Sequence, residues 1–229
     1  MKMSVSVRGS ARRTMKANKQ NSPYSAAVTG CGFMLDETVA LTPILAAPDA
    51  ELRLKAEIEG NRSSLLGKSK TRSRMITEFK RRYNAMPPSF WNWFLSLDRS
   101  GQTVALYYCL MRTYLIVKDV HLNLVLPRMK SANPVIVKAD VERHICTVAA
   151  VDPFVEGWSD VTKGKVAGSC LSYLRALGML SDSRELHPVP VADSVAGHFI
   201  SRGEGWYLES LGMPLYEINR VKEGRPSQP

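Results

Sequence analysis

The sequence lacks the short motifs that mark common nucleotide-processing enzymes and metalloproteases. It contains no G-x-x-x-x-G-K-[ST] loop, no G-x-G-x-x-G fingerprint and no H-E-x-x-H helix. Its histidines (His121, His144, His187 and His198) include no pair with metal-ligand spacing. A charged stretch at 140–144 has no accompanying nucleophile and is better explained by surface ion pairs. We therefore expect no catalytic residue, no metal, no cofactor and no small-molecule substrate, and hence no enzyme.

Closely spaced cysteines are also missing. The four cysteines are Cys31, Cys109, Cys146 and Cys170, and none lies within four residues of another. This spacing excludes a C-x-x-C redox or metal pair. Each cysteine has apolar neighbours, which favours buried thiols in a reducing compartment over disulfides.

No uninterrupted apolar run is long enough for a membrane span. The best candidate, residues 103–126, contains Arg112, Lys118 and Asp119. Each such charge near the bilayer centre costs about 2.5–3.5 kcal/mol. The basic N-terminus is not followed by an apolar stretch, as a secretory signal would require. These observations predict a cytoplasmic protein without membrane insertion.

Positive charge is abundant and unevenly placed. The net charge is +10, and residues 1–99 hold 17 lysines and arginines against 8 acidic residues. Residues 100–229 hold 14 against 13. An excess of this size favours an anionic partner, either nucleic acid or an acidic membrane surface.

The residue pattern is mainly α-helical. Apolar residues recur at helical spacing between proline-, glycine- and hydroxyl-rich stretches. The predicted helices span residues 36–41, 48–58, 70–86, 90–95, 103–117, 135–151 and 163–177. We divide the chain into a flexible basic tail (1–22), an N-terminal basic helical domain (23–100), a C-terminal helical domain (101–215) and a frayed tail (216–229). The predicted fold is a helical bundle.

The helix at 70–86 is strongly amphipathic and carries the sharpest functional signal. Its apolar side chains cluster within about 100° on one face, at Met75, Ile76, Phe79 and Tyr83. Almost opposite lie Lys70, Arg74 and Arg81. Two shorter helices precede it, as in a helix-turn-helix unit. The alternative is an ordinary solvated face, but the surrounding charge excess favours nucleic acid.

The start of this helix also suits a phosphate. Lysine and hydroxyl side chains gather where backbone N–H groups and the helix dipole attract anions. We predict phosphate-directed binding of double-stranded DNA by Arg62, Ser63, Lys68, Ser69, Lys70, Thr71, Arg74, Lys80, Arg81, Arg82, Lys163 and Lys165.

The last two of these residues belong to a unit typical of a winged helix. A capped helix from Thr162 ends at Gly178 and is followed by two predicted strands, 183–186 and 189–200, which would form a short β-hairpin. Many wings contact only protein, so base contact here is the weaker interpretation.

The order of residues resembles the BrxA family of BREX phage-resistance systems. The resemblance covers residues 25–211 and rests on the stretch 25–32, Asp36-Glu37-Thr38, Asn61, Ser69-x-Thr71-x-x-Arg74, Arg81-Arg82-Tyr83, the stretch 107–119, and Thr162-Lys163 with Leu174-x-x-Leu177-Gly178-Met179-Leu180. It implies a small helical DNA-binding component of a defence island, with no known catalytic site and with larger BREX proteins as partners. Some members carry an inner-membrane label, against which the charges inside 103–126 argue here.

Two other functions stay open at this point. An adaptor for a protein partner would use the aromatic stretch 90–95 or the wing, since the C-terminal half is nearly neutral. RNA binding is not separable from DNA binding by sequence. The aromatic side chains at 90–94 suit stacking on unpaired bases, although core packing explains them better.

Overall fold

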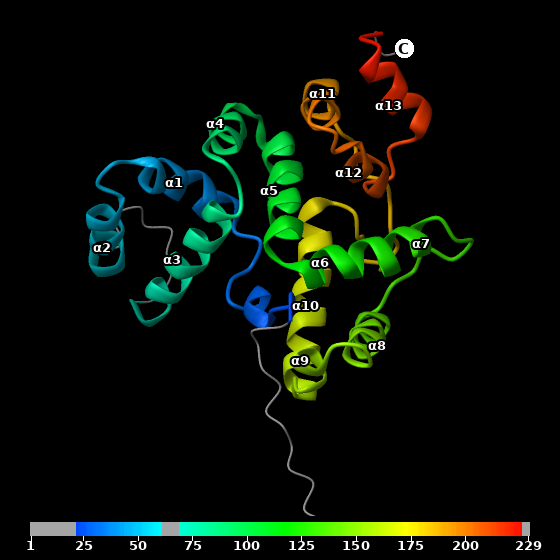
Figure 1. Ribbon diagram of the computed structural model, residues 1–229. Helices are drawn as coiled ribbons and strands as arrows, with labels where there is room; N and C mark the ends of the chain where they lie inside the picture. Colours follow the sequence, from blue (N-terminus) through cyan, green and yellow to red (C-terminus); the bar gives the residue numbers. More distant parts are fainter. Residues whose placement is uncertain (1–21, 61–68, 226–229) are drawn as a thin grey trace, which may run out of the picture.

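The computed structural model describes residues 22–60 and 69–225, and its regular elements are helices (Figure 1). In Figure 1 the first three α-helices lie on the left, α5 and α10 stand upright in the centre, and α11–α13 lie at the upper right. In chain order the elements are η2 (Ala26–Thr29), α1 (Leu35–Ala46), α2 (Ala50–Gly60), α3 (Ser69–Asn84), α4 (Pro88–Ser96), α5 (Arg99–Thr113), α6 (Leu115–Val120), the π-helical η3 (His121–Val125), α7 (Leu126–Met129), α8 (Lys138–Ala149), α9 (Pro153–Glu156), α10 (Asp160–Leu177), α11 (Asp193–Ser201), α12 (Gly205–Ser210) and α13 (Leu215–Lys222).

Helices α1, α2 and α3 contact one another and form a lobe with a small core of its own. The fully buried members of that core are Leu41, Leu54, Ile76 and Phe79. The predicted helix at 70–86 is confirmed as α3, which ends at Asn84, before two prolines that cannot continue it.

The main core is built around α5 and α10, which pack against each other. Helix α5 is buried from Val104 through Met111, so it has almost no solvent-facing side within that stretch. Helix α10 is capped by Ser159, whose hydroxyl accepts from the Thr162 amide, and ends at Gly178 with a left-handed φ of 82°. The predicted helices at 103–117, 135–151 and 163–177 are confirmed in outline by α5, α8 and α10.

The aromatic stretch at 90–95 belongs to this core. Phe90 and Trp91 are 2% exposed and Phe94 is 0% exposed. Of the four aromatic side chains, Trp93 lies nearest the surface, where it stacks on His198 with ring centroids 3.5 Å apart. The core-packing interpretation of the stretch is therefore confirmed, and stacking on bases loses its main support.

Two secondary-structure predictions in the C-terminal third are wrong. Residues 193–201 form helix α11 where the sequence predicts a strand over 189–200. The β-branched residues suggest a strand, but Val195, Ala196 and Phe199 have i, i+1, i+4 spacing and are all buried. The backbone is still extended at Ala192, the residue that precedes the helix.

The predicted frayed tail at 216–229 is also helical in its first part. Helix α13 continues to Lys222 and buries Ile218 against the core. Arg220 fastens it to α11 by two hydrogen bonds to the Asp193 carboxylate, 2.6 and 2.7 Å long. An apolar residue on one face and a bidentate ion pair on the other make this short helix stable.

No β-sheet is present in residues 22–60 and 69–225. The segment between α10 and α11 forms only isolated antiparallel bridges: Leu180 pairs with Leu186, and Glu185 pairs with Val135 of the connection between α7 and α8. The predicted β-hairpin and the winged-helix details are therefore not confirmed.

Three of the cysteines are buried and Cys146 is exposed, and all four are free thiols. Burial raises the pKa of the Cys109 and Cys170 thiols to about 12, which keeps both protonated at neutral pH. In the described part of the chain, no helix combines the length and the apolarity that crossing a bilayer requires.

Candidate nucleic-acid interface

Helix α3 has the two-sided character that its sequence predicts. Ile76 and Phe79 are each 2% exposed, and both pack toward α1 and α2. Arg74 and Arg81, on the other side, are exposed. We call these two arginines the basic face of α3.

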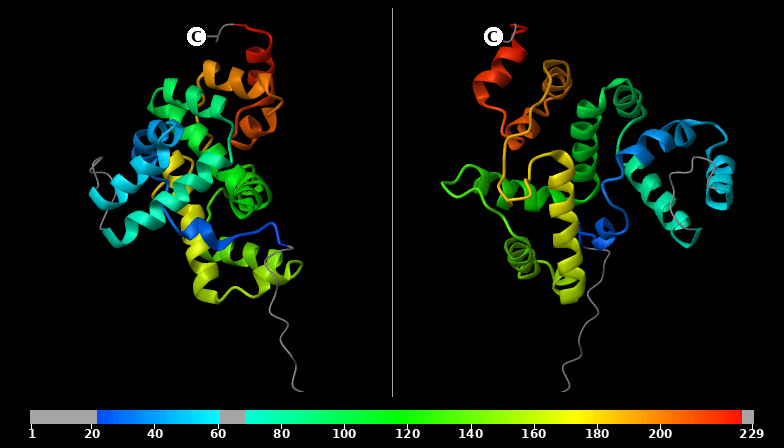
Figure 2. Two further views of the ribbon diagram at one scale, coloured as in Figure 1. Left: turned by 60° about the vertical axis from the view of Figure 1, so that its left-hand side comes forward. Right: turned by 180° about the vertical axis from the view of Figure 1, so that it is seen from behind.

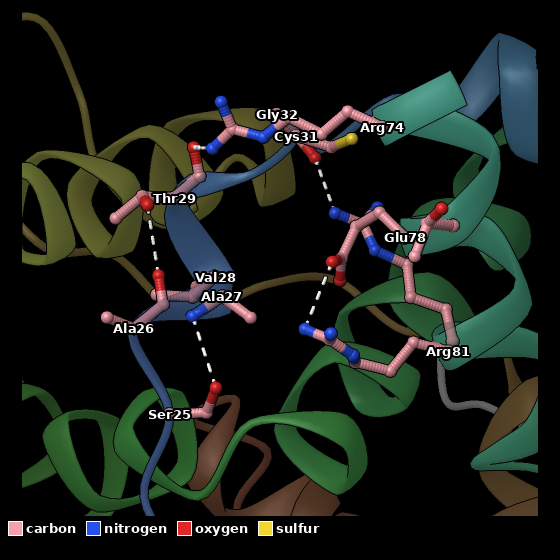
Figure 3. A network of polar contacts seen from close by, with 12 residues as sticks. Ser25, Ala26, Ala27, Val28, Thr29, Cys31, Gly32, Arg74, Glu78 and Arg81 are labelled. Carbon is pink, nitrogen blue, oxygen red and sulfur yellow. Dashed lines mark hydrogen bonds and ion pairs between the residues drawn. The ribbon is translucent and has the colours of Figure 1, made fainter. Parts of the chain in front are cut away.

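Residues 26–33, which we call the η2 segment, run between α3 and α10 (Figure 2). Its carbonyl oxygens point toward side chains of both helices. The Tyr173 hydroxyl of α10 lies 2.9 Å from the carbonyl oxygens of both Val28 and Cys31, and its single hydrogen is shared between them. Arg74 of α3 donates to the Thr29 carbonyl oxygen over 3.5 Å (Figure 3). The segment therefore links the N-terminal lobe to the main core.

Arg82 is not part of the basic surface, and its prediction as a nucleic-acid contact is wrong. It is 1% exposed and donates to the carbonyl oxygens of Gly32 (2.8 Å) and Phe33 (2.9 Å). The position lies one helical turn after Phe79 and so shares the buried face of α3. Its guanidinium satisfies backbone carbonyls of the η2 segment, and no surface is left for a phosphate.

A buried carboxylate lies between the exposed arginines. Glu78 is 4% exposed and pairs with Arg81 over 3.2 Å (Figure 3). Its Oε1 atom has no hydrogen-bond donor among the described residues. Burial raises the pKa of this carboxyl, although Arg81, Arg82 and Arg74 oppose the shift. The basic face thus has an internal counter-charge.

Around this carboxylate is a cavity of about 270 Å³ lined by Ala27, Gly30, Arg74, Thr77, Glu78 and Arg81. Gly30 is required at its edge, because a Cβ atom there would come within 2.9 Å of the Ala27 carbonyl oxygen. An anion that contacts α3 would meet the guanidinium groups of Arg74 and Arg81 here, and also the Glu78 carboxylate that pairs with Arg81.

The remaining predicted residues have different surroundings. Lys80 pairs with Glu51 of α2 over 2.7 Å and is less available to an anion. Lys163 is half-buried on α10, and Lys165 is exposed beside Thr29 and Gly32 of the η2 segment. Ser69, Lys70 and Thr71 occupy the first turn of α3. Three predicted residues fall outside the described residues: Arg62, Ser63 and Lys68.

The structure thus brings the basic face of α3 and Lys165 of α10 to opposite sides of one short segment. Sequence reasoning did not find the η2 segment, Glu78 or Tyr173 as parts of this site. The available signal was Gly30-Cys31-Gly32, since paired glycines often mark a close backbone approach. Periodicity within a single helix cannot reveal which distant segment packs against it.

The fold and this site together define an all-helical protein whose cationic surface is assembled from α3 and α10. A model of the BrxA family matches residues 22–203. The chain belongs to the BrxA family, and thus to the context of BREX phage resistance, as its sequence pattern predicts.

Among solved structures, the chain is similar to the crystal structure of an uncharacterized protein from Magnetospirillum magneticum. The TM-score is 0.69 and the sequence identity is 17%, over 83% of this chain and 98% of that one. This likeness concerns the fold alone. No curated protein matches the chain.

Proposed function

We propose that the chain is a non-catalytic, cytoplasmic component of BREX phage defence that binds double-stranded DNA mainly through backbone phosphates. The observation that carries the proposal is the exposed pair Arg74 and Arg81 on one face of α3, with Lys165 across the η2 segment. Other BREX proteins would supply the catalytic steps.

The spacing of these cations suits a polyanion better than a single small ligand. Arg74 and Arg81 are seven residues apart on α3, which corresponds to about 10 Å along a helix axis. Contacts this far apart reach more than one phosphate of a duplex. In this proposal, α3 follows two shorter helices, as the DNA-contacting helix does in a helix-turn-helix unit. Eight residues separate Gly60 from Ser69, so the connection is longer than the usual turn of about three or four residues.

A titration of labelled duplex DNA at two salt concentrations tests the proposal. We expect affinity to fall steeply with salt, because each neutralised phosphate releases counterions. Replacing Arg74 and Arg81 together with Ala should reduce the slope of log affinity against log salt by about 2, at roughly 0.9 per contact. The matched control is Lys80→Ala, which removes a cation already paired with Glu51. Absence of binding at low salt would overturn the proposal.

Competition separates DNA from RNA. Unlabelled duplex DNA should displace the probe at lower concentration than duplex RNA of the same sequence, since the A-form groove presents its phosphates differently. Equal or better competition by RNA would replace the substrate in this proposal with RNA.

A second candidate, an adaptor for a protein partner, is favoured by a cavity of about 350 Å³ between α5 and α11. Phe90, Tyr108 and Phe199 provide apolar walls. Arg112 and Arg202 also line the cavity, and Glu204 beside them pairs with Arg112 over 3.5 Å, which leaves Arg202 as the cation available to a partner. This chemistry suits an acidic segment of a larger BREX protein that bears an aromatic or aliphatic side chain. Co-purification of such a partner after nuclease treatment, lost on Arg202→Glu, is the expected outcome. A partner retained by that variant would exclude this cavity.

A further inference from the structure

A second polar cavity, of about 300 Å³, lies against α10 on the side of the η2 segment opposite to the Glu78 cavity. We call it the α10 pocket. It is lined by Thr29, Cys31, Gly32, Lys165, Gly168, Ser169, Ser172 and Tyr173. Lys165, Ser169 and Ser172 are at i, i+4 and i+7 and therefore share one face of the helix.

The lining has the chemistry of an anion site. It contains one cation and several hydroxyl groups, but no carboxylate. Lys165 is exposed and forms no ion pair within residues 22–60 and 69–225. In the same part of the chain, the hydroxyls of Ser169 and Ser172 have no hydrogen-bond partner. These donors are available to an incoming ligand with several acceptor oxygens.

Backbone carbonyl oxygens next to the pocket already accept hydrogen bonds from protein donors. Carbonyl oxygens of Val28 and Cys31 are bonded to the buried Tyr173 hydroxyl, and that of Thr29 to Arg74. Gly168 leaves open space, since a Cβ atom there would meet nothing within 4 Å. A tetrahedral anion therefore finds room and donors, with neighbouring carbonyl groups already occupied.

We propose that the α10 pocket binds one phosphate group of the nucleic-acid backbone, held by Lys165, Ser169 and Ser172. This inference rests on the proposed function, and it adds to the basic face of α3 a contact from the main core. One duplex would then touch the lobe and the core at once, on the two sides of the η2 segment. The site requires no base contact and is therefore indifferent to sequence.

Duplex DNA binding by two variants tests the pocket. Lys165→Met removes the cation, and Ser172→Asp places a carboxylate at an exposed position of the same face. We expect each to lower affinity at low salt about five- to tenfold, and Lys165→Met to reduce the salt slope by about 1. The control is Arg175→Met, which removes a cation from an exposed position of α10 outside the pocket. It should change affinity less than twofold.

Amide chemical shifts provide a readout that does not depend on affinity. Addition of a short DNA duplex should shift the signals of Gly32 and Gly168, and Lys165→Met should suppress the shift. Inorganic phosphate and vesicles containing phosphatidylglycerol serve as alternative sources of the same group. A response to either of these, without a response to DNA, would overturn the assignment to nucleic acid.

The outcomes separate this inference from the proposed function. If duplex DNA binds with a steep salt dependence but both variants match the wild type, the α10 pocket is wrong and DNA binding stands. If the wild type does not bind DNA at all, both fail. If Lys165→Met weakens binding no more than Arg175→Met does, only total charge matters and the pocket is not a site.

Discussion

The lobe of α1–α3 and the centre built on α5 and α10 are stabilised in different ways. The centre buries an uninterrupted run from Val104 to Met111 on one helix. Among the residues that the structure describes, the lobe has four buried hydrophobic residues in its own core. The lobe that has the smaller core also carries the basic face of α3. A strongly cationic helix leaves few positions for apolar burial, and the lobe depends on polar links to the rest of the protein.

The strongest of these links is Arg82, and its loss should have the largest effect. Arg82→Met removes two hydrogen bonds from a charged donor and leaves the carbonyl groups of Gly32 and Phe33 unpaired. We expect a loss of about 4 kcal/mol in the free energy of unfolding, measured with urea. Hydrogen exchange should show the loss in α1–α3 first, while α5 amides stay protected.

Lys55→Met is the matched control, because Lys55 is exposed on α2 of the same lobe and its loss should change stability by less than about 0.5 kcal/mol. A uniform loss of protection in both regions on Arg82→Met would contradict the view that the lobe is separately anchored.

Acid should destabilise the centre, through a buried histidine. His121 is fully buried, and burial lowers its pKa from 6.5 to about 4. Its Nε2 donates to the Ser210 carbonyl oxygen (2.9 Å), so Nδ1 accepts from the Tyr107 hydroxyl (2.7 Å). The neutral imidazole therefore satisfies both partners, with one nitrogen as donor and the other as acceptor.

Because the folded pKa is depressed, the stabilisation is complete above pH 6.5 and is lost as the pH falls toward 4. The loss should reach about 3 kcal/mol. His121→Gln offers an amide donor and acceptor without a titrating ring, and should reduce the slope of unfolding free energy against pH in this range. It should not abolish that slope, because burial also lowers the pKa of His198 to about 4. His187→Gln, at an exposed position, should leave the pH dependence intact. An unchanged slope in His121→Gln would assign acid sensitivity to other groups.

The smallest expected effect is on DNA affinity and concerns Glu78, whose negative charge partly neutralises the basic face of α3. Glu78→Gln removes the counter-charge next to Arg81 and should raise duplex affinity about threefold. Glu51→Gln removes the same charge from an exposed position of the lobe and should have a smaller effect. Equal effects would mean that Glu78 acts only through net charge.

The stability of Glu78→Gln at two pH values tests the direction of the Glu78 pKa shift. Because burial raises the folded pKa of Glu78, its contribution to stability is present below about pH 4.5 and is lost as the pH rises through the folded pKa. Glu78→Gln should therefore be more stable than the wild type at pH 7, and the difference should shrink on acidification. Thermal unfolding at pH 7 and pH 4 measures this.

The sequence was sufficient for features set by local pattern. Periodicity predicts α3 and α10, and Gly178 marks the end of α10 because few other residues adopt its left-handed backbone. The helical class and the BrxA family were also predictable. Local pattern was misleading at α11, where Val195 and Ile200 suggested a strand although burial follows helical spacing.

The candidate site was predictable only in part, because local sequence pattern does not show which distant segments pack together. Arg74, Arg81 and Lys165 are exposed as expected. Arg82 has the same chemistry as Arg81, but a rotation of about 100° places it on the buried face. The apolar periodicity already contained that information. The η2 segment, by contrast, is positioned by side chains far away in sequence, which a local pattern does not encode.

The bond between Tyr173 and Val28 also constrains the order of folding, since it joins positions 145 residues apart. A chain is synthesised from its N-terminus, and contacts between distant positions form late because closing a long loop is entropically costly. Residues 26–33 therefore cannot dock until α10 has left the ribosome. The helices of the lobe are made early, but the cationic surface shared with α10 is completed only when about three quarters of the chain exists.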